Sequence, residues 1–276
     1  MTVRIVTDSA CDLPRQLADA REITLVPLTV RFGTTELVDG KDLTPDQFWS
    51  RLRGASTLPE TAAPSVGAFQ SVFDELAGDG ASGIVCITLS SKLSATWQSA
   101  KAAASEVGCP VEVVDSKSIS LGIGNLALAA AERAAQGLGL DDVVADVLDR
   151  RDRTRVVGVV DTLEYLRKGG RIGGAQALVG TMLSVKPVLG IDDGEVALMG
   201  KVRTRPKALQ RMIDRIAGDT DARDLAVFHG DAADVDEFVE RLTPLARGKD
   251  IVVSLLGPVV GTHTGPGTIG VAYLAD

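Results

Sequence analysis

Three serines that follow an apolar run have the residue types and the spacing to bind an anion. The run, Ile84 to Leu89, is rich in β-branched residues, which is typical of a strand buried on both faces. Ser90, Ser91 and Ser94 come after it, and apolar residues at helical spacing follow, so we expect a helix that begins near Ser94. The unpaired N–H groups and the positive dipole of a helix N-terminus attract anions. The Ser94 hydroxyl could instead serve only as the helix N-cap.

Two groups of basic residues offer a second means of binding a carboxylate or a phosphate. Arg171 lies between two pairs of glycines, which allow the backbone to bend sharply and are expected to leave the guanidinium uncovered. An uncovered arginine suits bidentate binding of an oxyanion, although a flexible hinge with a solvated Arg171 fits the same pattern. The second group consists of Lys201, Arg203, Arg205 and Lys207 and lies at a strand-to-helix junction. A solvated face of the protein would show the same pattern.

Sequence motifs for nucleotide binding and for hydrolysis are absent or misplaced. The chain contains neither a G-x-x-x-x-G-K-[ST] P-loop nor a G-x-S-x-G nucleophile elbow. A match to G-x-G-x-x-A at residues 122–127 begins several residues after its strand, whereas a dinucleotide fingerprint needs its glycines in the turn itself. Serine hydrolase chemistry requires a histidine beside the nucleophile, and Ser94 with His263 is the pair that the sequence leaves open.

Composition and charge exclude several classes of function. The net charge of −8 and the pI near 4.9 argue against sequence-independent binding of nucleic acid. The 3 cysteines are odd in number and form no C-x-x-C pair, so neither a disulfide framework nor a zinc site is expected. Because no signal-peptide core and no membrane-spanning run are found, we expect a cytoplasmic protein without metal, cofactor or nucleic-acid partner.

The order of apolar segments predicts an α/β protein of two domains. Strands alternate with helices over residues 1–160, ending with a strand at Val156 to Val160, which indicates a parallel sheet with ligands at the carboxyl ends of its strands. Residues 161–276 begin with a helix, a glycine-rich break and a second helix to about Leu183. A hairpin and further αβ units follow, which predicts a C-terminal α+β domain. Thr57 to Pro64 lacks periodicity and is expected to be a loop.

Seven segments along the chain resemble the DegV family of bacterial fatty-acid-binding proteins, which serve a fatty acid kinase. No one segment is decisive, but seven in the same order are very specific, and the match runs nearly end to end. The segments are IVTDSACDLP (5–14), TAAPSVGAF (61–69), LSSKLSATWQSA (89–100), VVDSKSISLGIG (113–124), DTLEYLRKGGRIGG (161–174), SVKPVLGIDDGEV (184–196) and GPVVGTHTGPGTIGVAY (257–273).

The resemblance implies a DegV-like fold with one long-chain fatty acid held in a tunnel between the two domains. By position, it implies that Thr61 and Ser94 bind the carboxylate, that the backbone N–H of Ala95 assists, and that His263 joins this polar network. Two positions depart from the family pattern. The family's T-S-Q-P-S reads T-A-A-P-S at 61–65, and Ala95 stands where the family has glycine. The loss of a serine and a glutamine implies either a narrower polar network or a different preferred lipid, whereas Ala95 keeps its backbone N–H.

The resemblance also implies that Arg171 and Arg203 act when the kinase phosphorylates the bound acid. We therefore interpret the chain as a carrier that presents a fatty acid to a separate kinase, with a peripheral encounter with membranes left open. A sixteen-carbon tail contributes ~11 kcal/mol gross at ~0.8 kcal/mol per buried methylene, so the tail supplies affinity and the hydroxyls place the head. Two alternatives stand beside this reading: an acyl- or phosphoryl-transfer enzyme using Ser94 and His263, and a carrier for another carboxylated lipid.

Overall fold

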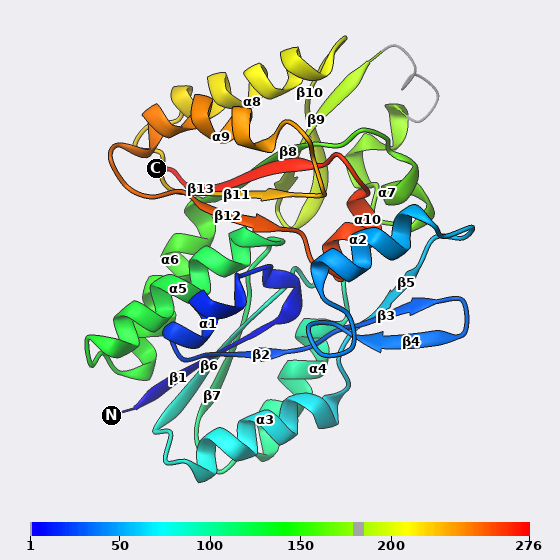
Figure 1. Ribbon diagram of the computed structural model, residues 1–276. Coiled ribbons are helices and arrows are strands. Elements are labelled where there is room, and N and C mark those ends of the chain that lie inside the picture. Colours follow the sequence, from blue (N-terminus) through cyan, green and yellow to red (C-terminus); the bar gives the residue numbers. More distant parts are fainter. Residues whose placement is uncertain (1, 179–184) are drawn as a thin grey trace.

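Two main sheets and the helices around them build the protein (Figure 1). The computed structural model describes residues 2–178 and 185–276. The first sheet has four parallel strands in the order β2-β1-β6-β7. Its strands are β1 (Val3–Asp8), β2 (Ile23–Val26), β6 (Gly83–Thr88) and β7 (Val111–Asp115). The helices around it are α1 (Arg15–Ala20), α3 (Val66–Gly78), α4 (Thr96–Ala103), α5 (Leu121–Ala135) and α6 (Leu140–Arg153).

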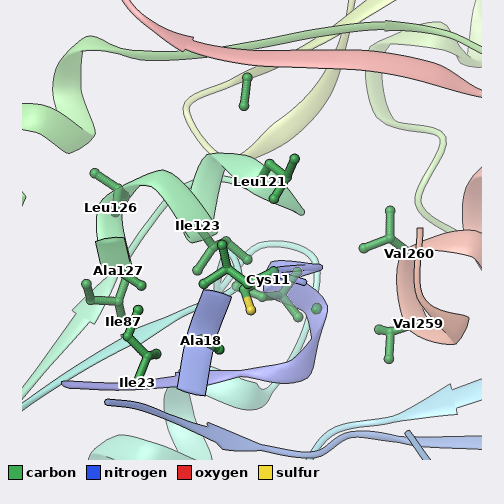
Figure 2. Packing of buried hydrophobic residues seen from close by; sticks show 14 of the residues in the cluster. Cys11, Ala18, Ile23, Ile87, Leu121, Ile123, Leu126, Ala127, Val259 and Val260 are labelled. Atoms are coloured by element: carbon green, nitrogen blue, oxygen red, sulfur yellow. The ribbon is translucent and has the colours of Figure 1, made fainter. Parts of the chain in front are cut away.

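Strand β6 shows why its sequence is a continuous apolar run. Successive side chains of a strand point to opposite faces of the sheet. Ile84 and Cys86 pack in the cluster that contains Phe69 of α3, whereas Val85 and Ile87 pack on the other face, in the cluster that contains α5. Figure 2 shows Ile87 close to the side chains of α5. The prediction of a strand buried on both faces is therefore confirmed.

The second sheet has six strands in the order β10-β9-β8-β13-β11-β12, and all its neighbours are antiparallel except β11 and β12. Helices α8 (Arg205–Gly218) and α9 (Val235–Leu242) supply side chains to the core on one face of this sheet. The strands are β8 (Thr154–Val159), β9 (Lys186–Asp192), β10 (Glu195–Val202), β11 (Arg223–His229), β12 (Val252–Leu255) and β13 (Ile269–Leu274).

Helix α5 lies between the two sheets and joins their cores (Figure 1). One cluster of buried side chains contains residues of β6 and α5 together with Val156, Phe228 and Ala272 of the second sheet. The approach is close, because a Cβ added at Gly122 would lie 2.8 Å from the Val156 side chain. The glycines of the G-x-G-x-x-A match therefore serve packing, not a phosphate.

A small third sheet and three short helices lie where the main sheets meet. The sheet has the order β4-β3-β5, and helix α10 contacts both β3 and β5. The tight turn between β3 and β4, with Gly33 at a φ of 61°, closes a hairpin. The elements are β3 (Thr29–Phe32), β4 (Thr35–Val38), β5 (Glu60–Ala62), α2 (Pro45–Arg53), α7 (Glu164–Lys168) and α10 (Pro258–Thr264).

Several local expectations need correction. Thr57 to Pro64 is not all loop, because its middle forms β5 and pairs with β3. The strand expected at Val156 to Val160 exists as β8, but it pairs with β13 and β9 and thus lies in the second sheet. The division at residue 160 remains a prediction. The helix expected to about Leu183 falls partly on residues 179–184, outside the described residues, and Gly173–Leu178 forms a 3-10 helix.

The turn between β9 and β10 ties the second sheet to the first half of the chain. Its Asp193 accepts hydrogen bonds from the Lys92 Nζ at 2.8 Å and the Lys117 Nζ at 2.7 Å, which lower the pKa of this carboxyl to about 2. The next residue, Gly194, accepts from the Ser90 hydroxyl at 2.7 Å. A Cβ at Gly194 would lie 2.5 Å from that hydroxyl oxygen, so the contact requires glycine.

Buried carboxyl groups make a second connection between the halves. Asp8 accepts from the backbone N–H groups of Ala10 at 3.0 Å and Leu89 at 2.7 Å, and Asp12 accepts from the N–H of Gly257, at the start of α10, at 2.9 Å. Burial raises the pKa of Asp8 to about 7 and that of Asp12 to about 8, and repulsion from Asp39 adds to both shifts. These groups therefore favour their protonated forms in the folded protein.

The raised pKa values predict that the contribution of these carboxyls to stability falls as the pH rises. Between about pH 4 and pH 8 the folded state binds more protons than the unfolded state, so each group lowers the unfolding free energy by up to about 1.4 kcal/mol per pH unit. We expect Asp12→Asn, which stays uncharged, to weaken this slope in denaturant titrations from pH 4 to pH 8. The exposed Asp74→Asn is the control. Parallel curves for wild type and Asp12→Asn would contradict the assignment.

Candidate functional site

Four of the residues singled out from the sequence line one cavity, which we call the head chamber. They are Thr61 on β5, Ser94 in the turn before α4, Arg171 after α7 and His263 on α10. The structure thus brings together side chains from both halves of the chain. The remaining lining is mainly apolar and consists of Leu28, Leu89, Leu93, Ile119, Leu166, Val196, Val259, Val260 and Thr264.

Thr61 and His263 form the polar centre of the head chamber. The Thr61 Oγ1 lies 2.9 Å from the His263 Nε2, so one of the two atoms donates a hydrogen bond to the other. Burial, aided by the nearby charge of Arg171, lowers the pKa of His263 to about 4. The imidazole is therefore neutral near pH 7. In that form it serves as a hydrogen-bonding group without adding a buried charge.

Helix α10 is held in place by large aromatic side chains of α2. The indole Nε1 of Trp49 donates to the carbonyl of Leu256 at 2.8 Å, just before the helix. Gly261 lets the helix approach, because a Cβ there would lie 2.6 Å from the Phe48 ring. On its opposite side His263 faces Gly169, where a Cβ would lie 2.2 Å from the ring Nδ1. The position of His263 thus depends on glycine at two close contacts.

Ser94 is the one serine of its turn that lines the head chamber. Among its neighbours, Ser90 donates to Gly194 and Ser91 bonds to Asp115. The N-cap position that the sequence left open for Ser94 belongs to Ala95, although the Ser94 Oγ accepts a hydrogen bond from the N–H of Thr96 at 3.4 Å. The Ser94 hydroxyl also lies 2.9 Å from the hydroxyl of Thr96. Its placement in the wall of the chamber, beside the start of α4, agrees with a role in binding an anion.

Arg171 is not uncovered as its glycine-rich surroundings suggest. Its side chain is half-buried, and Nε donates to the carbonyl of Leu93 at 3.0 Å while Nη1 donates to that of Gly169 at 2.7 Å. The glycines serve the backbone path, with positive φ values of 69° at Gly170 and 48° at Gly173. The contact with Leu93 joins the two halves directly beside Ser94. Arg171 is therefore a structural tie as well as a positive charge in the chamber wall.

Arg203 lies apart from the other four residues. It is exposed in the bend between β10 and α8, and it is not among the residues that line the head chamber. Arg205, from the same basic group, is bound by Asp234 at 2.7 Å and Asp161 at 2.9 Å. The basic group predicted from the sequence is thus divided between an ion-pair network and solvent.

A second cavity, which we call the tail chamber, adjoins the head chamber and is almost wholly apolar. The two share Ile119, Leu166, Val196 and Thr264 in their linings, so they meet at these residues. Sequence reasoning predicted the strand that contains Val156 and Val160 but assigned none of the tail-chamber residues to a binding site, because apolar strand residues have no distinctive spacing. The lining that belongs to the tail chamber alone consists of Val156, Gly158, Val159, Val160, Leu189, Gly190, Ile191, Phe228 and Thr268.

A polar hollow, which we call the vestibule, adjoins the polar residues of the head chamber. It shares Thr61, Arg171 and His263 with the head chamber. Its other lining residues include the exposed Lys168 and the half-buried Tyr165. The order from vestibule to head chamber to tail chamber thus runs from polar to apolar. This arrangement suits an amphipathic ligand with an anionic head and a long apolar tail.

The geometry gives no support to nucleophilic catalysis by Ser94 and His263. The hydrogen bonds recorded for their side chains join Ser94 to Thr96 and His263 to Thr61. A serine nucleophile requires its histidine base within hydrogen-bond reach. Within residues 2–178 and 185–276, no cluster of three or more metal-binding side chains is found, and no helix is long and apolar enough to cross a membrane.

Comparisons with known proteins agree with this arrangement. A family model described as "Uncharacterised protein, DegV family" matches residues 2–276. A DegV domain-containing protein of Streptomyces coelicolor is 40% identical over 98% of this chain and 97% of its own length. A DegV family protein of Thermus thermophilus described as binding fatty acid is 35% identical, with a TM-score of 0.91 and full coverage of both chains.

A solved structure from Eubacterium ventriosum names the ligand of another similar protein. This stearic acid-binding protein is 29% identical to the chain and has a TM-score of 0.88. The match covers 99% of this chain and 98% of the other protein. The parallel-sheet and mixed-sheet architecture is therefore the same as in proteins described as fatty-acid-binding.

We expect Gly169→Ala to displace the His263 ring, because the new methyl group would overlap the ring Nδ1. The displaced imidazole becomes more exposed to water, so its pKa should rise from about 4 toward the ordinary 6.5. NMR titration can follow it, since the chain has only 2 histidines. Gly78→Ala, whose Cβ would meet none of the described atoms within 4 Å, is the control. An unchanged titration of His263 in Gly169→Ala would overturn this account of its burial.

Proposed function

Because the chain belongs to the DegV family, we propose that it binds one long-chain fatty acid, with the carboxylate in the head chamber and the acyl tail in the tail chamber. The observation that carries this proposal is the direct junction of a polar site with an apolar cavity, at Ile119, Leu166 and Val196. The similar proteins of known structure that are described as fatty-acid-binding support it.

The head chamber offers suitable partners for a carboxylate. The hydroxyls of Thr61 and Ser94, the backbone N–H of Ala95 and the neutral imidazole of His263 can each take part in hydrogen bonds. Arg171 adds a positive charge without being a free side chain, since backbone carbonyls hold it in position. A hydrogen bond to a charged group contributes about 1.5–3 kcal/mol. Such bonds fix where the head lies and favour the ionised acid over an ester or alcohol.

The tail chamber accounts for the larger part of the affinity. Each buried methylene contributes ~0.8 kcal/mol, so a long acyl chain outweighs the head group even after the entropy of ordering is deducted. The lining is almost wholly apolar, so water has few polar groups to bind there. A short-chain acid would lose most of this contribution.

We further propose that the protein presents the carboxylate to a separate kinase, which converts it to an acyl phosphate. A carboxylate oxygen would form a bond to the terminal phosphorus of ATP while the bond to the ADP oxygen breaks. The vestibule supports this role, because it reaches Thr61 and His263 from the outside. The chain has no P-loop of its own. Arg171 would stabilise the transferred phosphoryl group, and the exposed Arg203 would contact the kinase.

The binding proposal predicts that the purified protein contains about one fatty acid per chain, measured by mass spectrometry after denaturing extraction. Thr61→Ala combined with Ser94→Ala removes both hydroxyls from the head chamber and leaves the carboxylate short of donors. Affinity for added fatty acid should fall by roughly tenfold to a hundredfold, from ~1.5–3 kcal/mol.

Ser105→Ala with Thr243→Ala, two exposed hydroxyls outside the site, is the matched control and should bind normally. Unchanged affinity in the head-chamber double variant would refute the assignment of the carboxylate site. A wild-type protein that neither carries nor takes up fatty acid would refute the binding function. Recovery of another carboxylated lipid would instead identify the protein as a carrier for that lipid.

The kinase proposal predicts that Arg203→Ala keeps its lipid and its melting temperature but supports less acyl-phosphate formation. Arg171→Ala should also lose stability, because the ties to Leu93 and Gly169 disappear. Its turnover should fall further, since an arginine that stabilises a phosphoryl group can contribute ~10³-fold in rate. Turnover is compared at equal lipid occupancy. The exposed Arg21→Ala is the control, and normal turnover in both site variants would count against the hand-off role.

A further inference from the structure

One row of residues across the second sheet contributes to the wall of the tail chamber where this chamber is separate from the head chamber. In the register of the antiparallel strands, Phe228 on β11 lies opposite Gly270 on β13, Gly270 lies opposite Gly158 on β8, and Gly158 lies opposite Leu189 on β9. Directly opposed residues of antiparallel strands point to the same face of a sheet. The row therefore reads phenylalanine, glycine, glycine and leucine on the face that turns toward α5.

The two glycines of this row have different neighbours. A Cβ added at Gly270 would lie 2.2 Å from the Phe228 ring, so the ring covers the space above this glycine. A Cβ at Gly158 would meet only backbone, the carbonyl oxygen of Ile269 at 3.2 Å and the Cα of Gly270 at 3.4 Å. No described side chain fills the space above Gly158, and Gly158 lines the tail chamber. The chamber thus occupies the place of a missing side chain, and the Phe228 ring stands beside it.

Phe228 lines the part of the tail chamber that is not shared with the head chamber. The linings of the two chambers share Ile119 and Thr264, whereas Phe228, Gly158 and Val156 belong to the tail chamber alone. The Phe228 side chain is 2% exposed and is part of the core between the sheets. A ring packed in this way cannot move aside without disturbing its neighbours.

We propose that Phe228 ends the acyl tunnel and thereby sets the longest fatty acid that the protein binds, while Gly158 provides the width for the chain. This proposal rests on the proposed fatty-acid binding. Up to the ring, each further methylene that the chamber buries strengthens binding by about fourfold. Beyond the ring, an additional methylene overpacks the core, which reverses the gain. The result is a cut-off in chain length, which a featureless apolar surface would not give.

The test is competition among saturated fatty acids from lauric to behenic acid for the delipidated protein, with the bound acids measured by mass spectrometry. Phe228→Leu and Phe228→Ala remove the ring, so the preferred length should increase. A shift of one even-numbered step would change the ratio of neighbouring acids by ~15-fold, from about fourfold per methylene. Gly158→Ala places a methyl group in the chamber and should shift the preference toward shorter acids.

Phe238→Leu is the matched control, because Phe238 is fully buried in the core on the other face of the sheet. It should reduce stability in the same way and leave the length preference unchanged. If Phe228→Ala fails to fold, the length preferences of the milder variants Phe228→Leu and Gly158→Ala provide the test. If the wild type prefers one chain length and these variants have the same preference, the role of Phe228 is overturned, but the fatty-acid-binding function is not. A wild type that binds no fatty acid overturns the binding function as well.

Discussion

The structure depends on holding two halves of the chain apart around an apolar cavity. Close packing is the normal state of a protein interior, and a cavity of this kind lowers stability. Polar contacts around its edge therefore have to fix the separation. Asp193 binds two lysines of the first half, Arg171 reaches the carbonyl of Leu93, Asp12 accepts from Gly257, and Thr61 meets His263. Each of these contacts crosses between distant parts of the sequence.

Burial determines the chemical character of the head chamber. The low pKa of His263 keeps the ring neutral, so the site holds one positive charge, on Arg171, and several neutral hydrogen-bonding groups. This combination suits a bound anion. It does not supply a base beside a nucleophile, which is what the enzymatic alternative needs. The distinction between a carrier and an enzyme thus comes from which side chains contact each other.

Glycine creates most of the close approaches on which the site is built. Gly169 leaves room for the His263 ring, Gly194 allows the hairpin to reach Ser90, and Gly270 accommodates the Phe228 ring. In each case the neighbouring group would overlap a Cβ. Gly169 and Gly194 lie in a glycine-rich break and a hairpin that the sequence already indicates, but the group that each glycine accommodates becomes visible only when the opposing element is known.

The sequence by itself determined the elements and much of the head chamber. Its apolar runs predicted β6 and the β9–β10 hairpin, and the family resemblance named Thr61, Ser94, Arg171 and His263, which share one cavity. It missed α10, whose seven residues contain a proline and a glycine and show no apolar period. Tertiary structure alone decided that β8 pairs in the second sheet, that Arg171 is tied to Leu93 and that Arg203 stands apart. Local patterns record whether a side chain is buried, but the partner that buries it is chosen by packing between segments far apart in the chain.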